Sequence, residues 1–409
     1  MSLITQCKGT EWITEASDRL LFTTNRPELI MDRGAGMYMW DTEDRVYLDF
    51  SGGWAVTSLG HAPAVIRDAL DQQSAKLIHA SPSFYNEPML QFAKLLTDIS
   101  CFDKVFFASS GAEANEAAIK LARKYGAAKL GGAHEIITMT HSFHGRTLAT
   151  MSATGKSQWD ALYEPKVPGF CHVPLNDLDA CFAAISDRTC AIMLELVQGE
   201  GGVNIVDESY LYAIRKACDI YGLLLIVDEV QTGIGRTGTM FAYENYGIEP
   251  DIMTLAKGIG GGFPLSAMLT KESFDLFEPG DQGGTYCGQP LAMAVGQAVV
   301  QEVIQSRLAD NARIQGDYLK RRLQETGEAL GWSQVRGMGL LVAFNIPLPC
   351  GAELVKRCLD IGLIINSPSP SVIRLMPALI VTTADVDKML RLLAECWEAL
   401  YREQQATAQ

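Results

Sequence analysis

The 409-residue sequence lacks several features that would assign it to particular classes of protein. It has no apolar run near the length that crosses a bilayer, and its beginning lacks the apolar core of a secretory signal, so we expect a cytoplasmic protein. Basic residues are few, 34 against 48 acidic ones, for a net charge of −14. A chain of this sign repels nucleic acid and acidic membranes, so neither is an expected partner.

Metal-binding patterns are also absent. The ten cysteines include no C-x-x-C pair and no regular spacing, which favours reduced, mostly buried thiols over disulfides or a zinc site. His141 and His144 lack the helical or cysteine partners of a metal site, so we expect no metal. The apolar fraction of 48% and the length predict a globular chain with two lobes.

One lysine lies between a short apolar run and a loop of glycines, in D-I-M-T-L-A-K-G-I-G-G-G-F-P. The apolar part, residues 252–256, is bounded by proline and glycine, which indicates a buried strand that ends at Lys257. Apolar surroundings lower the pKa of a lysine, so that its neutral amine becomes a nucleophile towards an aldehyde. The simpler alternative is a lysine that ends a strand and reaches solvent.

A second apolar run, L-L-L-I-V-D-E-V at residues 223–230, ends in two carboxylates. Parallel strands deliver such residues to their carboxyl edge, where Asp228 and Lys257 would meet. Pyridoxal phosphate requires a lysine that forms a Schiff base and an aspartate that keeps the pyridine nitrogen protonated. The pair therefore predicts a site for pyridoxal 5′-phosphate, with Gln231 close to Asp228.

The rest of the pattern predicts an α/β chain with a mostly parallel sheet covered by helices, because strand-like runs alternate with helical stretches. These runs are residues 104–108, 135–139, 191–196, 224–227, 252–256 and 265–269. A hairpin is expected over 36–50, with its aromatic residues, Tyr38, Trp40 and Tyr47, on one face. We also expect a helix over 64–77, one helical stretch from 290 to about 326, and strands of a second lobe over 335–344 and 372–375.

A turn of small residues follows the run 104–108 and opens a helix. Backbone N–H groups at such a turn point at an anion, which the helix dipole also favours, so Ser110, Gly111 and Ala112 are expected to bind a phosphate. An ordinary serine N-cap is the alternative.

Three more loops carry candidate residues. In H-S-F-H-G-R-T, Phe143 suits stacking on a flat cofactor and Arg146 suits a carboxylate, although a surface arginine beside a buried ring has the same pattern. E-L-V-Q-G-E-G-G places Glu195 and Glu200 at and beyond a strand end, where functional acids gather. Thr285, in G-G-T-Y-C-G-Q-P, lies in a glycine loop, where its hydroxyl could donate a hydrogen bond to a phosphate.

A nucleotide hydrolase is the alternative from another class. Gly155, Lys156 and Ser157 match the end of a phosphate loop. The first glycine of such a loop would fall at Thr150, and no buried strand aims the loop at a phosphate, so the spacing argues against it.

Five motifs resemble those of the class III aminotransferases of fold type I. They are S-G-A-E-A-N-E-A-A-I-K-L-A-R, S-F-H-G-R-T, Q-G-E-G-G, D-E-V-Q-T-G-I-G-R-T-G and A-K-G-I-G-G-G-F-P, in this order and spacing. The resemblance covers nearly the whole chain. It implies a homodimer with shared active sites, a large domain over 56–290 with a sheet of the seven-stranded type, and a smaller α+β domain from both termini, 1–55 and 291–409.

The resemblance also implies roles towards the cofactor. Lys257 would form the Schiff base, Asp228 would meet the pyridine nitrogen, Gln231 the ring hydroxyl, and Phe143 would stack on the ring. The phosphate would be held by Gly111, Ala112 and, from the other subunit, Thr285.

Towards the substrate, the resemblance implies transfer of the distal amino group of N2-acetylornithine to 2-oxoglutarate, a step of arginine biosynthesis. Arg146 would bind the α-carboxylate of the amino donor. Arg374 would bind a carboxylate of 2-oxoglutarate, and Glu200 would pair with Arg374 while an amino donor is present.

Some residues depart from the pattern of that branch. Gln289 replaces the usual asparagine, Leu196 replaces a proline, and Gly284 stands where relatives often have a serine that helps to bind the substrate. Tyr38 matches a tyrosine that ornithine-specific members use for the α-carboxylate. Ornithine, succinylornithine, 4-aminobutyrate, lysine and a diamine therefore stay open as alternative donors.

Overall fold

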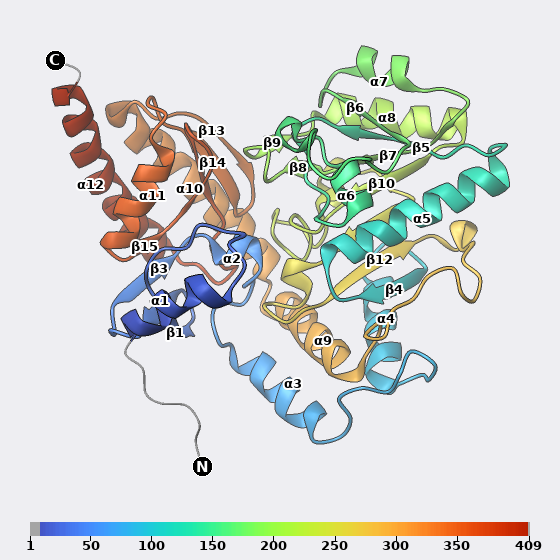
Figure 1. The fold of residues 1–409 in the computed structure, drawn as a ribbon, viewed down its shortest axis with the longest axis horizontal. Coiled ribbons are helices and arrows are strands. Elements are labelled where there is room, and N and C mark those ends of the chain that lie inside the picture. Colours follow the sequence, from blue (N-terminus) through green and yellow to red (C-terminus); the bar gives the residue numbers. More distant parts are fainter. Residues whose placement is uncertain (1–8, 408–409) are drawn as a thin grey trace.

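The computed structural model describes residues 9–407, which form two lobes (Figure 1). The larger lobe is built on a seven-stranded sheet in the order β4-β12-β11-β10-β7-β5-β6. Its strands are β4 (Lys104–Ala108), β5 (Glu135–Met139), β6 (Phe170–Val173), β7 (Thr189–Leu194), β10 (Leu224–Asp228), β11 (Ile252–Leu255) and β12 (Ser266–Thr270). Of these, β12 alone runs in the direction opposite to the other six strands, so the mostly parallel sheet is confirmed.

The central strands are apolar throughout because helices cover both faces of the sheet. In β10, Leu224 and Ile226 pack in one core cluster with the alanine-rich helix α5 (Gly111–Lys129). The alternate residues, Leu225 and Val227, pack in the other cluster with α8 (Glu208–Tyr221). Since successive side chains of a strand point to opposite faces, the two helices lie on opposite sides of the sheet. The carboxyl ends of the parallel strands stay open between them.

The smaller lobe combines both ends of the chain (Figure 1). One sheet has the order β1-β2-β3-β15, in which β15 from the C-terminal part runs parallel to β3 from the N-terminal part. The other has the order β13-β14-β17-β16. Their strands are β1 (Met31–Ala35), β2 (Tyr38–Asp41), β3 (Val46–Asp49), β13 (Ser333–Met338), β14 (Leu341–Asn345), β15 (Leu363–Ile364), β16 (Asn366–Ser369) and β17 (Val372–Leu375). The exact boundaries of the two domains stay a prediction.

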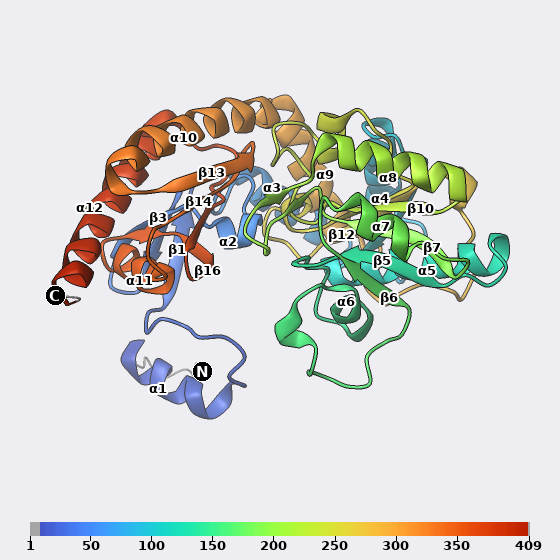
Figure 2. The same cartoon turned by 90° about the horizontal axis from the view of Figure 1, so that it is seen from above.

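Helices complete both lobes. In the smaller lobe α10 (Leu308–Leu330), α11 (Gly351–Asp360) and α12 (Thr383–Thr407) pack on one another and on its sheets, while α9 (Pro290–Gln305) packs on α3 (Ala64–Ser74) and α4 (Glu87–Asp98). The remaining α-helices and strands are α1 (Gly9–Arg19), α2 (Gly52–Ala55), α6 (Leu148–Ala153), α7 (Leu178–Ala184), β8 (Val197–Gln198) and β9 (Asn204–Ile205). Helix α1 stands apart from both lobes (Figure 2). No helix within residues 9–407 is both long and apolar enough to cross a membrane.

Two expectations about elements are wrong, and one strand was not predicted. The helical stretch after Pro290 is two helices, because Arg307 has φ +50° and interrupts the hydrogen-bond ladder between α9 and α10. Residues 335–344 are not one strand but the hairpin of β13 and β14, which turns at Gly339 with φ +55°. The edge strand β6 was not expected from the sequence.

The three aromatic residues of the first hairpin do not share a face. Tyr47 pairs across the hairpin with Met39, whereas Tyr38 and Trp40 lie on the alternate positions of β2. Directly paired residues point to the same side of a sheet, so Tyr47 faces away from the other two rings. Its buried hydroxyl donates to the Asp41 carboxylate at 2.7 Å, a bond that fixes the turn of the hairpin.

Candidate active site

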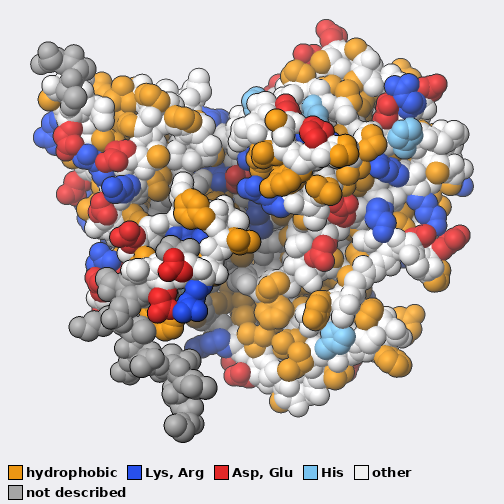
Figure 3. Space-filling model, in the orientation of Figure 1, with side chains coloured by type: hydrophobic (Ala, Val, Ile, Leu, Met, Phe, Trp, Pro, Cys, Tyr) orange, Lys and Arg blue, Asp and Glu red, His pale blue; other side chains and the backbone are white. Residues whose placement is uncertain are grey.

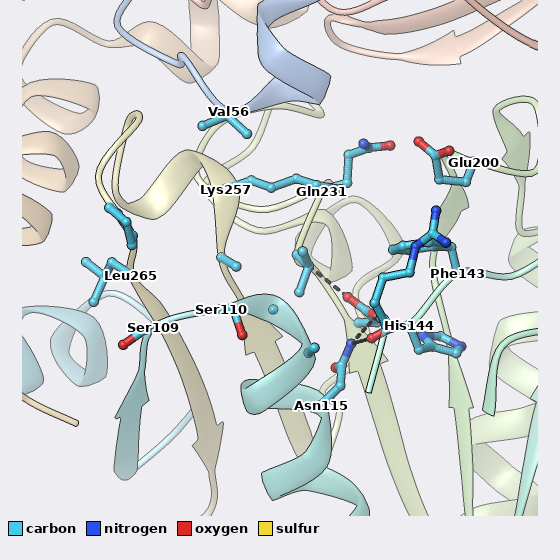
Figure 4. Close-up of a pocket in the computed structure, with 18 of the residues that line it drawn as sticks. Val56, Ser109, Ser110, Asn115, Phe143, His144, Glu200, Gln231, Lys257 and Leu265 are labelled. Carbon is cyan, nitrogen blue, oxygen red and sulfur yellow. Dashed lines mark hydrogen bonds and ion pairs between the residues drawn. The ribbon is translucent and has the colours of Figure 1, made fainter. Parts of the chain in front are cut away.

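A cavity of about 510 Å³ lies at the carboxyl ends of the parallel strands. Figure 3 shows the molecule hollowed between its lobes, with basic side chains gathered along the hollow. Ten of the residues predicted from the sequence line this cavity, namely Ser110, Gly111, Ala112, Phe143, Arg146, Glu195, Glu200, Asp228, Gln231 and Lys257. Figure 4 shows Asn115 and His144 on its lower side, Lys257, Gln231 and Glu200 on its upper side, and Phe143 between them.

Lys257 follows β11 after one residue, Ala256, and begins a short 3-10 turn. Its φ of +46° lies in the left-handed region, which a side chain occupies only when the surrounding structure holds it there. The amine enters the cavity instead of ending the strand in bulk solvent. Burial lowers the pKa of Lys257, and Arg374 lowers it further, while Glu200 and Asp228 act against this. At a given pH, a larger fraction of Lys257 is therefore in the neutral amine form than for a lysine in water.

Asp228 ends β10 in a network that reasoning from the sequence missed. Its Oδ2 accepts hydrogen bonds from His144 Nδ1 and Asn115 Nδ2, both at 2.8 Å, and its Oδ1 accepts from the Val230 N–H at 3.0 Å. Burial on its own lowers the pKa of His144, but the hydrogen bond and the charge of Asp228, together with the charge of Glu195, raise it above its ordinary value. Three donors therefore hold one buried carboxylate in a fixed direction.

The side chain of Gln231 lines the same cavity. Its Nε2 donates to the Trp54 carbonyl at 3.3 Å, while its buried Oε1 has no hydrogen-bond partner among the described residues. A β-carbon on Gly199 would lie 1.5 Å from Oε1, so glycine is required there for the amide to fit. A buried acceptor that lacks a donor calls for a ligand hydroxyl or a water.

Helix α5 begins at the edge of the cavity. Ser110 is its N-cap and accepts from the Glu113 N–H at 3.3 Å, so the simple capping role is present. The first backbone bond of the helix runs from the Ala114 N–H to the Ser110 carbonyl. Gly111 and Ala112 come before it, in the turn whose N–H groups a helix leaves without internal partners. Those groups and the helix dipole suit a phosphate.

Aromatic and basic side chains meet on the opposite wall. The half-buried Phe143 ring packs at the edge of Trp159, with ring centres 5.8 Å apart. The Arg146 guanidinium lies 4.5 Å from the centre of the Trp159 ring and also faces the cavity. The Phe143 N–H donates to the buried Glu195 carboxylate at 2.8 Å, and burial raises the pKa of Glu195.

Glu200 and Arg374 form an ion pair with 2.7 Å between Oε1 and Nη2. Arg374 lies on β17 of the smaller lobe and is buried, so this pair joins the two lobes. Burial alone raises the pKa of Glu200, but Arg374, with Lys257 and Lys156, lowers it below its ordinary value. The Arg374 Nη1 is buried without a partner among the described residues, so it retains a hydrogen-bond donor for another acceptor.

Four predicted residues, Tyr38, Gly284, Thr285 and Arg374, are not among those that line the cavity, although Arg374 pairs with the lining residue Glu200. The Tyr38 hydroxyl contacts Asp385 at 3.5 Å in the smaller lobe. Gly284 and Thr285 lie in an exposed loop, where the Thr285 carbonyl accepts from His79 at 2.7 Å. Within residues 9–407 no group of three or more His, Cys, Asp or Glu side chains is arranged to hold a metal.

The arrangement fits pyridoxal phosphate. It offers an amine for the aldehyde, a fixed carboxylate for the ring nitrogen, an unpaired amide oxygen for the ring hydroxyl and a helix start for the phosphate. The four groups lie in one cavity of suitable size for a flat cofactor. His144 and Asn115 were not predicted because their link to Asp228 spans 84 and 113 residues of sequence.

Comparisons with known proteins agree with this geometry. Residues 22–397 match the family described as aminotransferase class-III. The chain is 50% identical to acetylornithine aminotransferase of Ralstonia nicotianae over 91% of its length and 96% of the relative. It is 46% identical to acetylornithine aminotransferase of Caldanaerobacter subterraneus over 93% of its length and 98% of the relative.

Solved structures show the same fold. Ornithine aminotransferase from Toxoplasma gondii superimposes with a TM-score of 0.93 at 27% identity, covering 97% of this chain and 96% of that one. Acetylornithine aminotransferase from Elizabethkingia anophelis gives a TM-score of 0.86 at 30% identity, covering 96% and 100%. The expected resemblance and fold type I are confirmed. The chain belongs to the class III aminotransferases and is a pyridoxal-phosphate-dependent enzyme.

Proposed function

We propose that this enzyme transfers the distal amino group of N2-acetylornithine to 2-oxoglutarate in arginine biosynthesis. The observation that carries the proposal is one cavity lined by Lys257, Asp228 and Arg146, with a second arginine, Arg374, paired to the lining residue Glu200. One arginine, Arg146, is free to hold the carboxylate of a donor, and the other, Arg374, is covered by Glu200. The relatives with 46–50% identity that bear the name acetylornithine aminotransferase support the same substrate.

Each residue then has a defined task. Pyridoxal phosphate supplies an aldehyde that condenses with amines and a ring that takes up electrons from the bond being broken. Asp228 keeps the ring nitrogen protonated, Gln231 holds the ring hydroxyl, and Phe143 packs on the ring. Ser110, Gly111 and Ala112 anchor the phosphate, and the Nζ of Lys257 moves the proton on the substrate carbon.

Arg146 orients the donor in this proposal. Its guanidinium binds the α-carboxylate bidentately, which directs the other end of an ornithine chain towards Lys257. While Glu200 covers Arg374, an acyl group beside it meets a neutral ion pair instead of a bare guanidinium. 2-Oxoglutarate has a second carboxylate and takes the place of Glu200 on Arg374.

A panel of donor half-reactions tests the substrate. Without 2-oxoglutarate, each donor is mixed with the enzyme, and the loss of visible absorbance of the bound cofactor is followed. The panel contains N2-acetylornithine, N2-succinylornithine, ornithine, lysine, 4-aminobutyrate and a simple diamine. N2-Acetylornithine should react fastest by about tenfold or more, a difference of about 1.4 kcal/mol in the barrier.

Ornithine is the main alternative, because a solved ornithine aminotransferase superimposes with a TM-score of 0.93. A faster reaction with ornithine would transfer the assignment to that substrate. A faster reaction with 4-aminobutyrate or with a diamine that has no carboxylate would contradict both the proposed donor and the role of Arg146.

We also propose a homodimer with shared active sites, in which Thr285 of the partner subunit contacts the phosphate. The exposed position of the 283–286 loop, outside the cavity of its own chain, supports this. Mixed subunits give a direct test. Lys257→Ala and Thr285→Ala subunits, unfolded and refolded together, form hybrid dimers in which one site has an intact lysine and an intact threonine.

Equal mixing should restore about a quarter of the wild-type sites, since half of the dimers are hybrids with one intact site of two. Each variant refolded alone is the control and should stay well below that level. Light scattering at the assay concentration reports the dimer. Full activity of a monomer, or no gain on mixing, would contradict shared sites. The cytoplasmic location stays a prediction.

A further inference from the structure

The carboxylate of Glu200 lies between two cations, and only one of them is Arg374. Its Oε1 is 2.7 Å from Arg374 Nη2, while its Oε2 is 3.9 Å from Lys156 Nζ. Lys156 follows α6 in the loop of the larger lobe, and Arg374 belongs to the smaller lobe. The two oxygens of one side chain therefore face cations from different lobes.

Lys156 is held in place by aromatic rings. Its Nζ lies 5.1 Å from the centre of the Phe143 ring and 5.4 Å from that of Trp159. The side chain is 16% exposed, and among the described residues Glu200 is the acid within 4 Å of its ammonium. The other charged groups that act on Lys156 are Arg146, Glu195 and Arg374. A cation fixed in this way is a ready partner for a nearby carboxylate.

The proposed function requires such a partner. When 2-oxoglutarate binds Arg374, Glu200 must leave it, and a half-buried carboxylate that loses the cation at hydrogen-bond distance is destabilised unless another cation takes its place. We propose that Lys156 is a positioning residue: it forms the ion pair with the Glu200 carboxylate when 2-oxoglutarate occupies Arg374. The inference rests on the proposed function for the exchange itself, and it adds a residue to that exchange.

The backbone near Glu200 favours a side-chain rotation over a loop movement. A β-carbon on Gly199 would lie 1.5 Å from Gln231 Oε1, and one on Gly201 would lie 2.7 Å from the His141 carbonyl. The chain on both sides of Glu200 is thus tightly packed against other loops. Because Oε2 already faces Lys156, rotation of the side chain suffices to exchange one cation for the other.

Lys156→Met tests the proposal, since methionine keeps the apolar stem and removes the charge. The two half-reactions are measured separately by the absorbance of the bound cofactor. The rate constant for 2-oxoglutarate, kcat/KM, should fall about tenfold, equivalent to about 1.4 kcal/mol. The donor half-reaction should stay within about twofold, because the donor leaves Glu200 on Arg374. Lys156→Arg keeps the charge and should restore most of the 2-oxoglutarate reaction.

A Glu200→Gln background shows whether Lys156 acts through Glu200. Glutamine carries no charge that Lys156 could pair with. In the Glu200→Gln enzyme, Lys156→Met should therefore change the 2-oxoglutarate reaction by less than about twofold. Thermal melting and cofactor content of each variant report folding. An equal loss in both half-reactions, or the same tenfold loss in the glutamine background, would overturn the inference. The Lys156 test can be run with any donor that reacts. If another donor proves fastest in the panel, that result contradicts the proposed substrate and leaves the role of Lys156 to be tested separately.

Discussion

Replacing Lys257 with alanine should abolish turnover and remove the visible absorbance that bound cofactor gives to the wild-type enzyme. Lys257 is the one lysine that lines the cavity in the described part of the chain, so no other amine is in place to replace it. Loss of a group that both holds the cofactor and moves a proton should lower kcat by about 10⁴-fold or more. Steady-state assays with 2-oxoglutarate and absorbance spectra measure both effects.

Alanine is the suitable replacement at this position because Lys257 has φ +46°. Lysine and alanine both carry a β-carbon, so they share the strain of the left-handed region, and a change in activity reports the loss of the side chain beyond the β-carbon rather than a change in backbone strain. Lys271→Ala is a matched control, since Lys271 follows the neighbouring strand β12 and pairs with Glu249 at 2.7 Å on the opposite edge of the sheet. Turnover by Lys257→Ala at a normal rate would show that the central assignment is wrong.

The sequence allowed the position of Lys257 and Asp228 to be predicted because each follows an uninterrupted apolar run. A strand buried on both faces produces such a run, and the place where it stops marks the edge of the sheet. The five residues of β4 and of β5 were predicted without error for the same reason. The small-residue turn at Ser110 similarly revealed the start of α5.

Features that depend on contacts between distant segments could not be predicted from the sequence. The direction of β12 was not predicted, because an apolar run is the same in a parallel and an antiparallel strand. The edge strand β6, Phe170–Val173, is short and mixes polar with apolar residues, so it gave no periodic signal. The break at Arg307 depends on a backbone conformation that arginine does not favour, and no proline or glycine marks it.

The network around Asp228 was missed for a related reason. In the sequence, Asn115 belongs to a helical motif, and His144 suggests only a metal ligand without partners. Their shared target becomes visible only when α5, the loop after β5 and the end of β10 come together in space (Figure 4). A buried histidine two residues before Arg146 gives no signal of its own, because many such residues are simply satisfied core groups.

This network makes the result of Asp228→Asn specific. Asp228 accepts three hydrogen bonds, from His144, Asn115 and the Val230 N–H. An asparagine has one oxygen, so its amide group must face at least one of these donors. It also carries no charge for a protonated ring nitrogen or for His144, whose pKa is raised by its bond to Asp228. The substitution therefore alters the electrostatics at the ring while the shape of the side chain is kept.

We expect Asp228→Asn to lower the donor half-reaction by at least about a hundredfold, the scale of losing one preorganised electrostatic contact. Cofactor binding should persist, because Lys257 and the start of α5 are unchanged, so visible absorbance separates a chemical defect from loss of the cofactor. Asp251→Asn is the matched control, since Asp251 is a buried acid at the other end of the same sheet, where it pairs with Arg215 at 2.8 Å. That variant should lose thermal stability and keep its rate per bound cofactor. If Asp228→Asn retained a normal half-reaction, the carboxylate would not act on the ring nitrogen.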